Sequence, residues 1–185
     1  DVTNLETSKV QIKSILGWIL YSAAGVIMFL AVTNILTADI APIPLLWVLP
    51  LAIYMLSFVL NFKKNPYCPN WIIRGFHFII SFGVLFYFMM KTESVPIYLE
   101  LVLLLGVTFL VCIFAQFKLF QTKPEDNRSL PHFYFIVSLG GFIGGVVVTW
   151  IVPLVTTLFL EYFGGFIAIS MALALEKKSP KKLYF

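Results

Sequence analysis

The sequence predicts an all-α membrane protein with six transmembrane helices and both termini in the cytoplasm. Of its 185 residues, 60% are hydrophobic and only 12% are charged, whereas soluble domains have about 45–50% apolar and about 25% charged residues. The apolar residues fall into long runs separated by short polar breaks. Most runs approach the roughly 20 residues that a helix needs to cross a hydrocarbon core about 30 Å thick.

The apolar runs fix the expected order of elements. We expect spans at residues 15–36, 44–62, 71–90, 97–117, 132–152 and 158–175. This divides the chain into a cytoplasmic N-terminal segment (1–13), a six-helix membrane domain (14–176) and a basic cytoplasmic tail (177–185). No alternating ten-residue pattern typical of a β-barrel is present, so the backbone must be satisfied within helices.

Prolines predict the irregular places in these spans. Pro44 lies at the start of the second run, where a missing N–H group costs little. Pro50 lies about two turns further on and should kink that helix. The fifth span should stop before Pro153. The following segment, 153–160, is itself apolar and leaves a bent or re-entrant connection open.

The positive charges predict the orientation. With six crossings, 12 of the 13 Lys and Arg residues fall on the side of the termini, and Lys91 alone falls on the other side. Cytoplasmic loops carry such an excess of Lys and Arg. The twelve are Lys9, Lys13, Lys63, Lys64, Arg74, Lys118, Lys123, Arg128, Lys177, Lys178, Lys181 and Lys182. Five or seven helices would destroy this bias.

The sequence gives no positive sign of catalysis, a cofactor or a metal site. Cys68 and Cys112 form no CxxC or Cys/His spacing, so we expect free thiols. No Ser/His/Asp trio, HExxH motif or paired carboxylates on one helix face is found. His77 is more simply a packed histidine than a proton relay. The basic residues explain topology better than nucleic-acid binding, which we do not expect.

The polar break after the first span offers candidate ligand-binding residues. These are Asn34, Asp39 and Trp47 around the break, with Glu100 and Glu161 at the outer ends of later spans. If they converge, a cation is the natural guest, because acids within a membrane are expensive and often functional. The alternative is a set of interfacial acids facing water, with Asp39 in ordinary turn chemistry before prolines. We favour that alternative.

A run of small residues in the fifth span predicts close helix packing. Gly140, Gly141, Gly144 and Gly145 form two overlapping GxxxG pairs, flanked by Ser138 and Thr149. Small residues let two transmembrane helices approach closely. A phosphate-binding glycine loop would need a strand before it and a solvated helix start, and neither is expected here.

Two stretches carry a resemblance to a known family. AVTNILTADIAPIPLLWVLPLAIYMLSFVLNF (31–62) and HFYFIVSLGGFIGG (132–145) followed by Pro153 resemble the membrane region of spermidine-synthase-like integral membrane proteins. The Glu161-Tyr162 dipeptide also looks like a family feature. The resemblance covers roughly residues 18–175. It implies a polytopic architecture, but not aminopropyl transfer, because the soluble domain that such proteins typically carry is not in this sequence.

These observations favour a non-enzymatic membrane module in a bacterial inner membrane. It would be a subunit or anchoring domain packed against other membrane subunits or a missing soluble domain, surrounded by lipid. The chain begins at Asp1 and would then be a fragment or a processed product. The alternative is a transporter or half-transporter for a small molecule or a polyamine-like cation.

Overall fold

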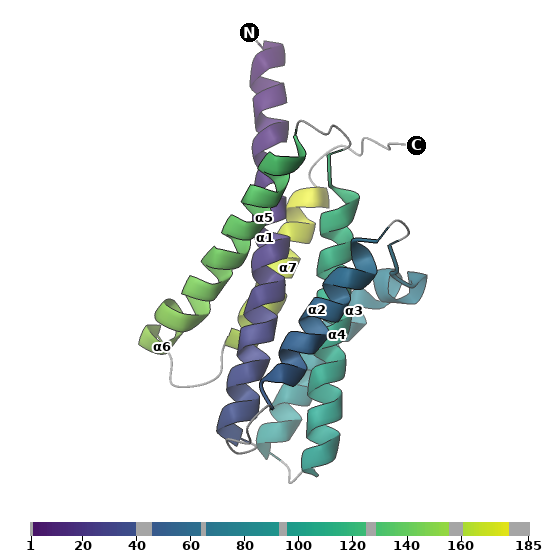
Figure 1. Ribbon diagram of the computed structural model, residues 1–185, viewed down its shortest axis with the longest axis vertical. Helices are drawn as coiled ribbons and strands as arrows, with labels where there is room; N and C mark the ends of the chain where they lie inside the picture. The colour runs from purple at the N-terminus through teal and green to yellow at the C-terminus, as the bar shows by residue number, and fades with distance from the viewer. Residues whose placement is uncertain are drawn as a thin grey trace.

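In the computed structural model, all regular secondary structure among the described residues is helical (Figure 1). It describes residues 2–39, 46–63, 66–92, 96–124, 129–155 and 161–177. The elements are α1 (Val2–Asp39), α2 (Val48–Asn61), α3 (Asn70–Thr92), α4 (Ile97–Gln121), α5 (Leu130–Val146), the π-helical turn η1 (Val147–Ile151), α6 (Val152–Val155) and α7 (Glu161–Lys177). The predicted all-α class is confirmed.

Four of the expected spans are long and apolar enough to cross a membrane. They are Ser14–Ala38, Asn70–Met90, Ile97–Gln121 and Leu130–Leu154. The other two expected spans correspond to shorter helices, α2 with 14 residues and α7 with 17. At 1.5 Å per residue these measure about 21 Å and about 26 Å, less than the hydrocarbon core of about 30 Å. The polar segment before the first span is helical and continuous with α1.

The long helix α1 lies at the centre of the bundle. Its most extensive contacts are with α7, α5 and α4, while α2 and α3 pack mainly on α4. Figure 1 shows the long helices running alternately up and down, with the start of α1 and the end of α7 at one end of the bundle. The buried core joins α1, α3, α4 and α7 through side chains such as Met28, Ile35, Phe76, Phe114 and Ile169. The rings of Phe76 and Phe114 stack with centroids 3.7 Å apart.

The outer surface of the bundle is strongly apolar. Phe78 on α3, Trp150 in η1 and Leu154 on α6 are 80%, 73% and 86% exposed. A soluble protein rarely exposes a contiguous apolar surface of this kind, because it would associate or aggregate in water. The structure therefore agrees with the expectation that this chain is embedded in lipid.

Both proline predictions within the described residues are wrong. Pro50 does not lie two turns into a helix, because α2 begins at Val48 and Pro50 is in its first turn. There the missing N–H removes no bond within the helix. Pro44 lies outside the described residues.

The fifth helix does not stop before Pro153 but continues through it to Val155. The preceding residues form the wider π turn η1, in which the Val152 N–H donates to the Val147 carbonyl, five residues back. A proline in a regular α-helix clashes with the carbonyl four residues earlier, and the wider turn relaxes that clash. Residues 156–160 of the expected bent connection lie outside the described residues.

Candidate functional site

A partly buried polar pair joins the end of α1 to the start of α7. The Asn34 side-chain N–H donates to Glu161 Oε1 at 3.3 Å. Small residues on α7 make this approach possible, because Gly164 and Gly165 lie against Ile27 and Met28 of α1. A β-carbon at Gly165 would meet the Met28 side chain. The sequence places the two polar residues on separate spans, and the packing of glycines brings them together.

The Glu161 carboxylate is only partly satisfied. The residue is 7% exposed, and its Oε2 atom has no hydrogen-bond partner among the described residues. No side chain that the structure describes forms an ion pair with this carboxylate, and the Lys91 side chain at the end of α3 lies outside the described residues. The N-terminus of α7 favours the negative charge, but the nearby C-terminus of α1 opposes it. A buried carboxylate with one amide partner is expensive unless a further group neutralises it.

The next residue, Tyr162, extends the buried polar region toward α3. Tyr162 is fully buried, and its hydroxyl has no partner among the described residues. Its ring stacks on Tyr87 with centroids 5.6 Å apart. The hydroxyl lies 3.4 Å from the position that a β-carbon would take at Gly83. Both residues of the Glu161-Tyr162 dipeptide therefore bury polar groups, one beside α1 and one beside α3.

The other predicted ligand-binding residues lie at the same end of the bundle. Asp39 is the last residue of α1, but its side chain and the break that follows it lie outside the described residues. Trp47 precedes α2 and is 51% exposed. Glu100 lies half-buried in the first turn of α4. Of the predicted set, the structure shows direct contact between Asn34 and Glu161.

The two GxxxG pairs of α5 face different surroundings. β-carbons at Gly140 and Gly144 would lie 2.7 Å and 2.8 Å from the Ile19 and Ala23 backbone carbonyls of α1. A β-carbon at Gly141 would make ordinary contact with Val26 at 3.4 Å, and one at Gly145 would meet nothing within 4 Å. The predicted packing role therefore belongs, within this chain, to the first pair.

Ser138 does not share that packing face, since it is exposed on α5. His77 is likewise exposed on α3, so the expectation of a packed histidine is wrong. Cys68 and Cys112 are free thiols, as expected. Among the described residues, no group of three or more His, Cys, Asp and Glu side chains is suited to a metal ion.

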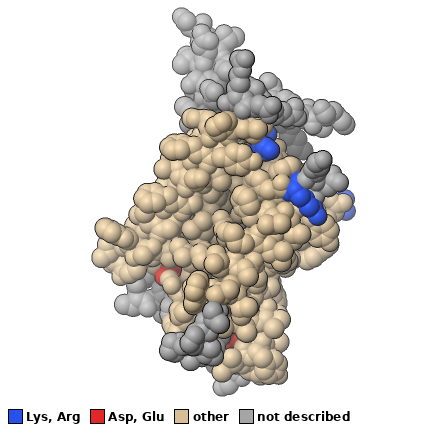
Figure 2. All heavy atoms as spheres, in the orientation of Figure 1, with Lys and Arg blue, Asp and Glu red and all other residues tan. Residues whose placement is uncertain are grey.

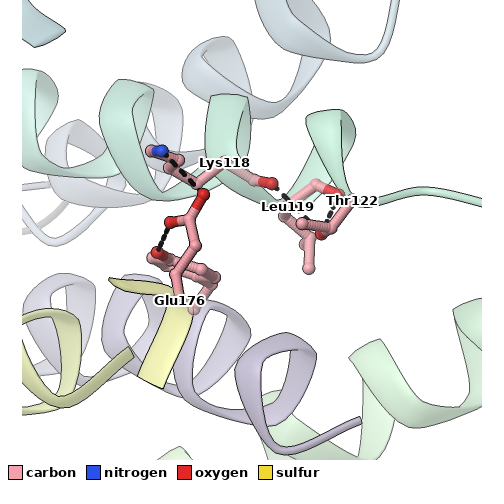
Figure 3. Close-up of polar contacts among 5 residues, drawn as sticks. Lys118, Leu119, Thr122 and Glu176 are labelled. Atoms are coloured by element: carbon pink, nitrogen blue, oxygen red, sulfur yellow. Dashed lines mark hydrogen bonds and ion pairs between the residues drawn. The ribbon is translucent and has the colours of Figure 1, made fainter. Parts of the chain in front are cut away.

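Sequence reasoning missed a polar cluster at the end of the bundle where the termini lie. The Lys118 ammonium lies 3.0 Å from Glu176 Oε1 (Figure 3). The Tyr21 hydroxyl donates to the other carboxylate oxygen, Oε2, at 2.9 Å. This cluster joins α4, α7 and α1. The sequence shows Glu176 only as the polar end of a span, and nothing in it indicates its partners.

Sequence reasoning also missed buried amides inside the bundle. Asn61 on α2 donates to the backbone carbonyls of Ser57 and Ile113, at 3.0 Å and 3.2 Å. Gln116 on α4 is 1% exposed, and its side chain hydrogen-bonds with that of Tyr54. A lone amide in an apolar run was the available signal, because such side chains join neighbouring transmembrane helices.

No family model, curated protein or solved structure matches this chain. The resemblance to spermidine-synthase-like membrane regions therefore stays a prediction.

Proposed function

We propose that the chain is a non-enzymatic integral membrane module, a subunit or anchoring domain that crosses the membrane six times with cytoplasmic termini. Charge distribution supports the orientation. On the face drawn in Figure 2, Lys and Arg gather toward the end of the bundle that carries the termini, and Asp and Glu toward the other end. In this proposal α2 and α7 cross together with the chain segments that flank them. The membrane would be the inner membrane of a bacterium.

The observation that best supports a module is an uncovered stripe of small residues that runs along α5 into η1. Ser138 and Thr149 are exposed, and open space lies over Gly145 between them. The Thr149 hydroxyl donates to the Gly145 carbonyl at 2.5 Å, so it needs no partner in lipid. Gly141 continues the stripe beside Val26. A transmembrane helix of a partner subunit could approach this stripe closely, as small-residue interfaces allow.

Two adjacent glycines separate partner binding from folding. Gly145→Leu adds a side chain where no described atom lies within 4 Å, whereas Gly144→Leu drives one into the α1 backbone. We expect Gly145→Leu to keep the thermal stability of the purified protein in detergent and to lose co-purifying membrane subunits. Gly144→Leu should lower stability itself. Unchanged co-purification with Gly145→Leu would contradict this role for the stripe.

The resemblance to spermidine-synthase-like proteins adds one more partner to the proposal. A soluble domain encoded next to this chain, or continuous with it, would be anchored at the cytoplasmic face. The neighbouring reading frame tests this, because a spermidine-synthase-like domain directly downstream would make the chain a membrane anchor.

The partly buried Asn34–Glu161 pair favours a second candidate, a transporter or half-transporter for a small molecule or polyamine-like cation. Transporter sites place polar groups where helices are interrupted, between membrane segments. Uptake of labelled polyamines and simple cations into proteoliposomes tests it, with Glu161→Gln as the inactive variant. No uptake by the wild-type protein would leave the module as the function.

A further inference from the structure

We propose that Glu161 Oε2 binds one monovalent cation, of the alkali-metal class, between the C-terminal end of α1 and the start of α7. The inference rests on the Asn34–Glu161 pair that also supports the second candidate function. The proposal concerns binding of the ion and does not require that the protein transports it.

The first argument is the state of the carboxylate. Glu161 is more than nine-tenths buried, and Oε2 has no partner among the described residues. An ion removed from water without a counter-charge is penalised by several kcal/mol even after relaxation. Asn34 supplies one neutral hydrogen bond, to the other oxygen. The remaining oxygen is therefore an acceptor for a positive group that no described residue supplies.

The second argument is the local field. Asn34 lies in the last two turns of α1, which ends at Asp39. The C-terminal end of a helix carries a partial negative charge on its unpaired carbonyl groups. The Thr33 and Thr37 hydroxyls do not supply donors to the site, because each donates to a backbone carbonyl of α1. Carbonyl and carboxylate oxygens attract a cation and repel an anion.

The third argument selects the kind of cation. Calcium carries two positive charges and is commonly held by several carboxylates. The described residues hold no cluster of three or more His, Cys, Asp and Glu side chains. A single carboxylate neutralises a single positive charge. An extended polyamine would need an open path past a side chain that is only 7% exposed. A compact monovalent ion fits these conditions.

Asn34 acts as a positioning residue in this site. Its amide N–H holds Oε1 and so fixes the direction in which Oε2 points. Loss of groups that orient metal ligands typically weakens affinity about 10–100-fold.

Thermal unfolding in detergent near neutral pH tests the site. Sodium or potassium chloride is compared with choline chloride at equal ionic strength, for the wild type, Glu161→Gln and Asn34→Ala. Because a ligand that binds only the folded state stabilises it, we expect sodium or potassium to raise the wild-type midpoint in a saturable way. Asn34→Ala should shift half-saturation about tenfold or more, and Glu161→Gln should remove the response.

Glu176→Gln is the control and should keep the wild-type response to sodium or potassium, because it removes an acid from the opposite end of α7. Equilibrium dialysis with radioactive sodium and potassium gives a second readout, and Glu161→Asp replaces Glu161→Gln if the latter does not fold. A wild type that binds neither ion, or a Glu161→Gln response equal to that of wild type, would overturn the proposal. Binding without proteoliposome uptake would keep the site and reject only the transporter.

Discussion

At the scale of single residues, Gly140 of α5 decides how closely that helix can approach α1. A β-carbon at Gly140 would lie 2.7 Å from the Ile19 carbonyl oxygen and 2.9 Å from its Cα, both rigid backbone atoms of α1. We expect Gly140→Ala to separate α1 from α5 and to destabilise the fold by about 1–3 kcal/mol, as overpacking does. Gly106→Ala is the control, because nothing lies within 4 Å there and alanine is the better helix former. Thermal midpoints in detergent that fall equally for both variants would contradict this reading.

Another single residue gives a prediction about pH. Cys68 lies in the loop between α2 and α3, and burial raises the pKa of its thiol to about 11, although the nearby Lys118 ammonium acts in the opposite direction. The reactive species is the thiolate. Maleimide labelling of Cys68 in a Cys112→Ala background should therefore be slow at neutral pH and rise about tenfold per pH unit toward pH 11. Lys118→Gln should slow it further, and a rate that levels off near pH 9 would show a normal thiol.

At the scale of elements, α7 is held at both ends by carboxylates on its first and penultimate residues. Glu161 meets Asn34 of α1 at one end, and Glu176 meets Lys118 of α4 at the other. The second pair is partly open, with side chains 16% and 42% exposed, so we expect it to contribute at most about 1 kcal/mol. Lys118→Glu or Glu176→Lys should lower the thermal midpoint by placing like charges together. The double exchange should recover most of the loss, and failure to recover would show that the ion pair does not hold the helices.

Some features of the helices can be predicted from the sequence and others cannot. Apolar length located the spans near Ser14–Ala38, Asn70–Met90, Ile97–Gln121 and Leu130–Leu154. The consequences of proline were not predictable, because they depend on where a helix starts and on whether a π turn precedes the ring. Pro50 falls in a first turn, and Pro153 follows η1. Neither the start of a helix nor a preceding π turn can be predicted from the hydrophobicity of the sequence.

At the scale of the whole molecule, composition predicted the helical class but not the packing partners. Asn34 and Glu161 form a hydrogen bond although they are 127 positions apart in the chain. The favoured expectation was that the acids at the outer ends of the spans face water, whereas Glu161 is only 7% exposed. Nothing in the sequence indicates which face of α7 meets α1, because the small residues that decide it, Gly164 and Gly165, lie in an apolar run. The Tyr21–Glu176 contact spans 155 positions and was missed for the same reason. The charge and length of a span can be read from its own residues. The neighbours of a helix depend instead on the shapes of the side chains that meet when the chain folds.

The membrane topology is the prediction that tests the whole arrangement. The start of α1 and the end of α7 lie at one end of the bundle in Figure 1, and α1 ends at Asp39 near the opposite end. With 12 of the 13 Lys and Arg residues on the side of the termini, that side should be cytoplasmic. A single cysteine at position 39 should label with a membrane-impermeant maleimide added outside, and one at position 180 only after the membrane is opened. Cys68 and Cys112 are replaced by alanine in both proteins, and labelling after solubilisation controls for buried sites. Labelling of both positions from the same side would reject the odd number of crossings, five, that the six-span topology places between them.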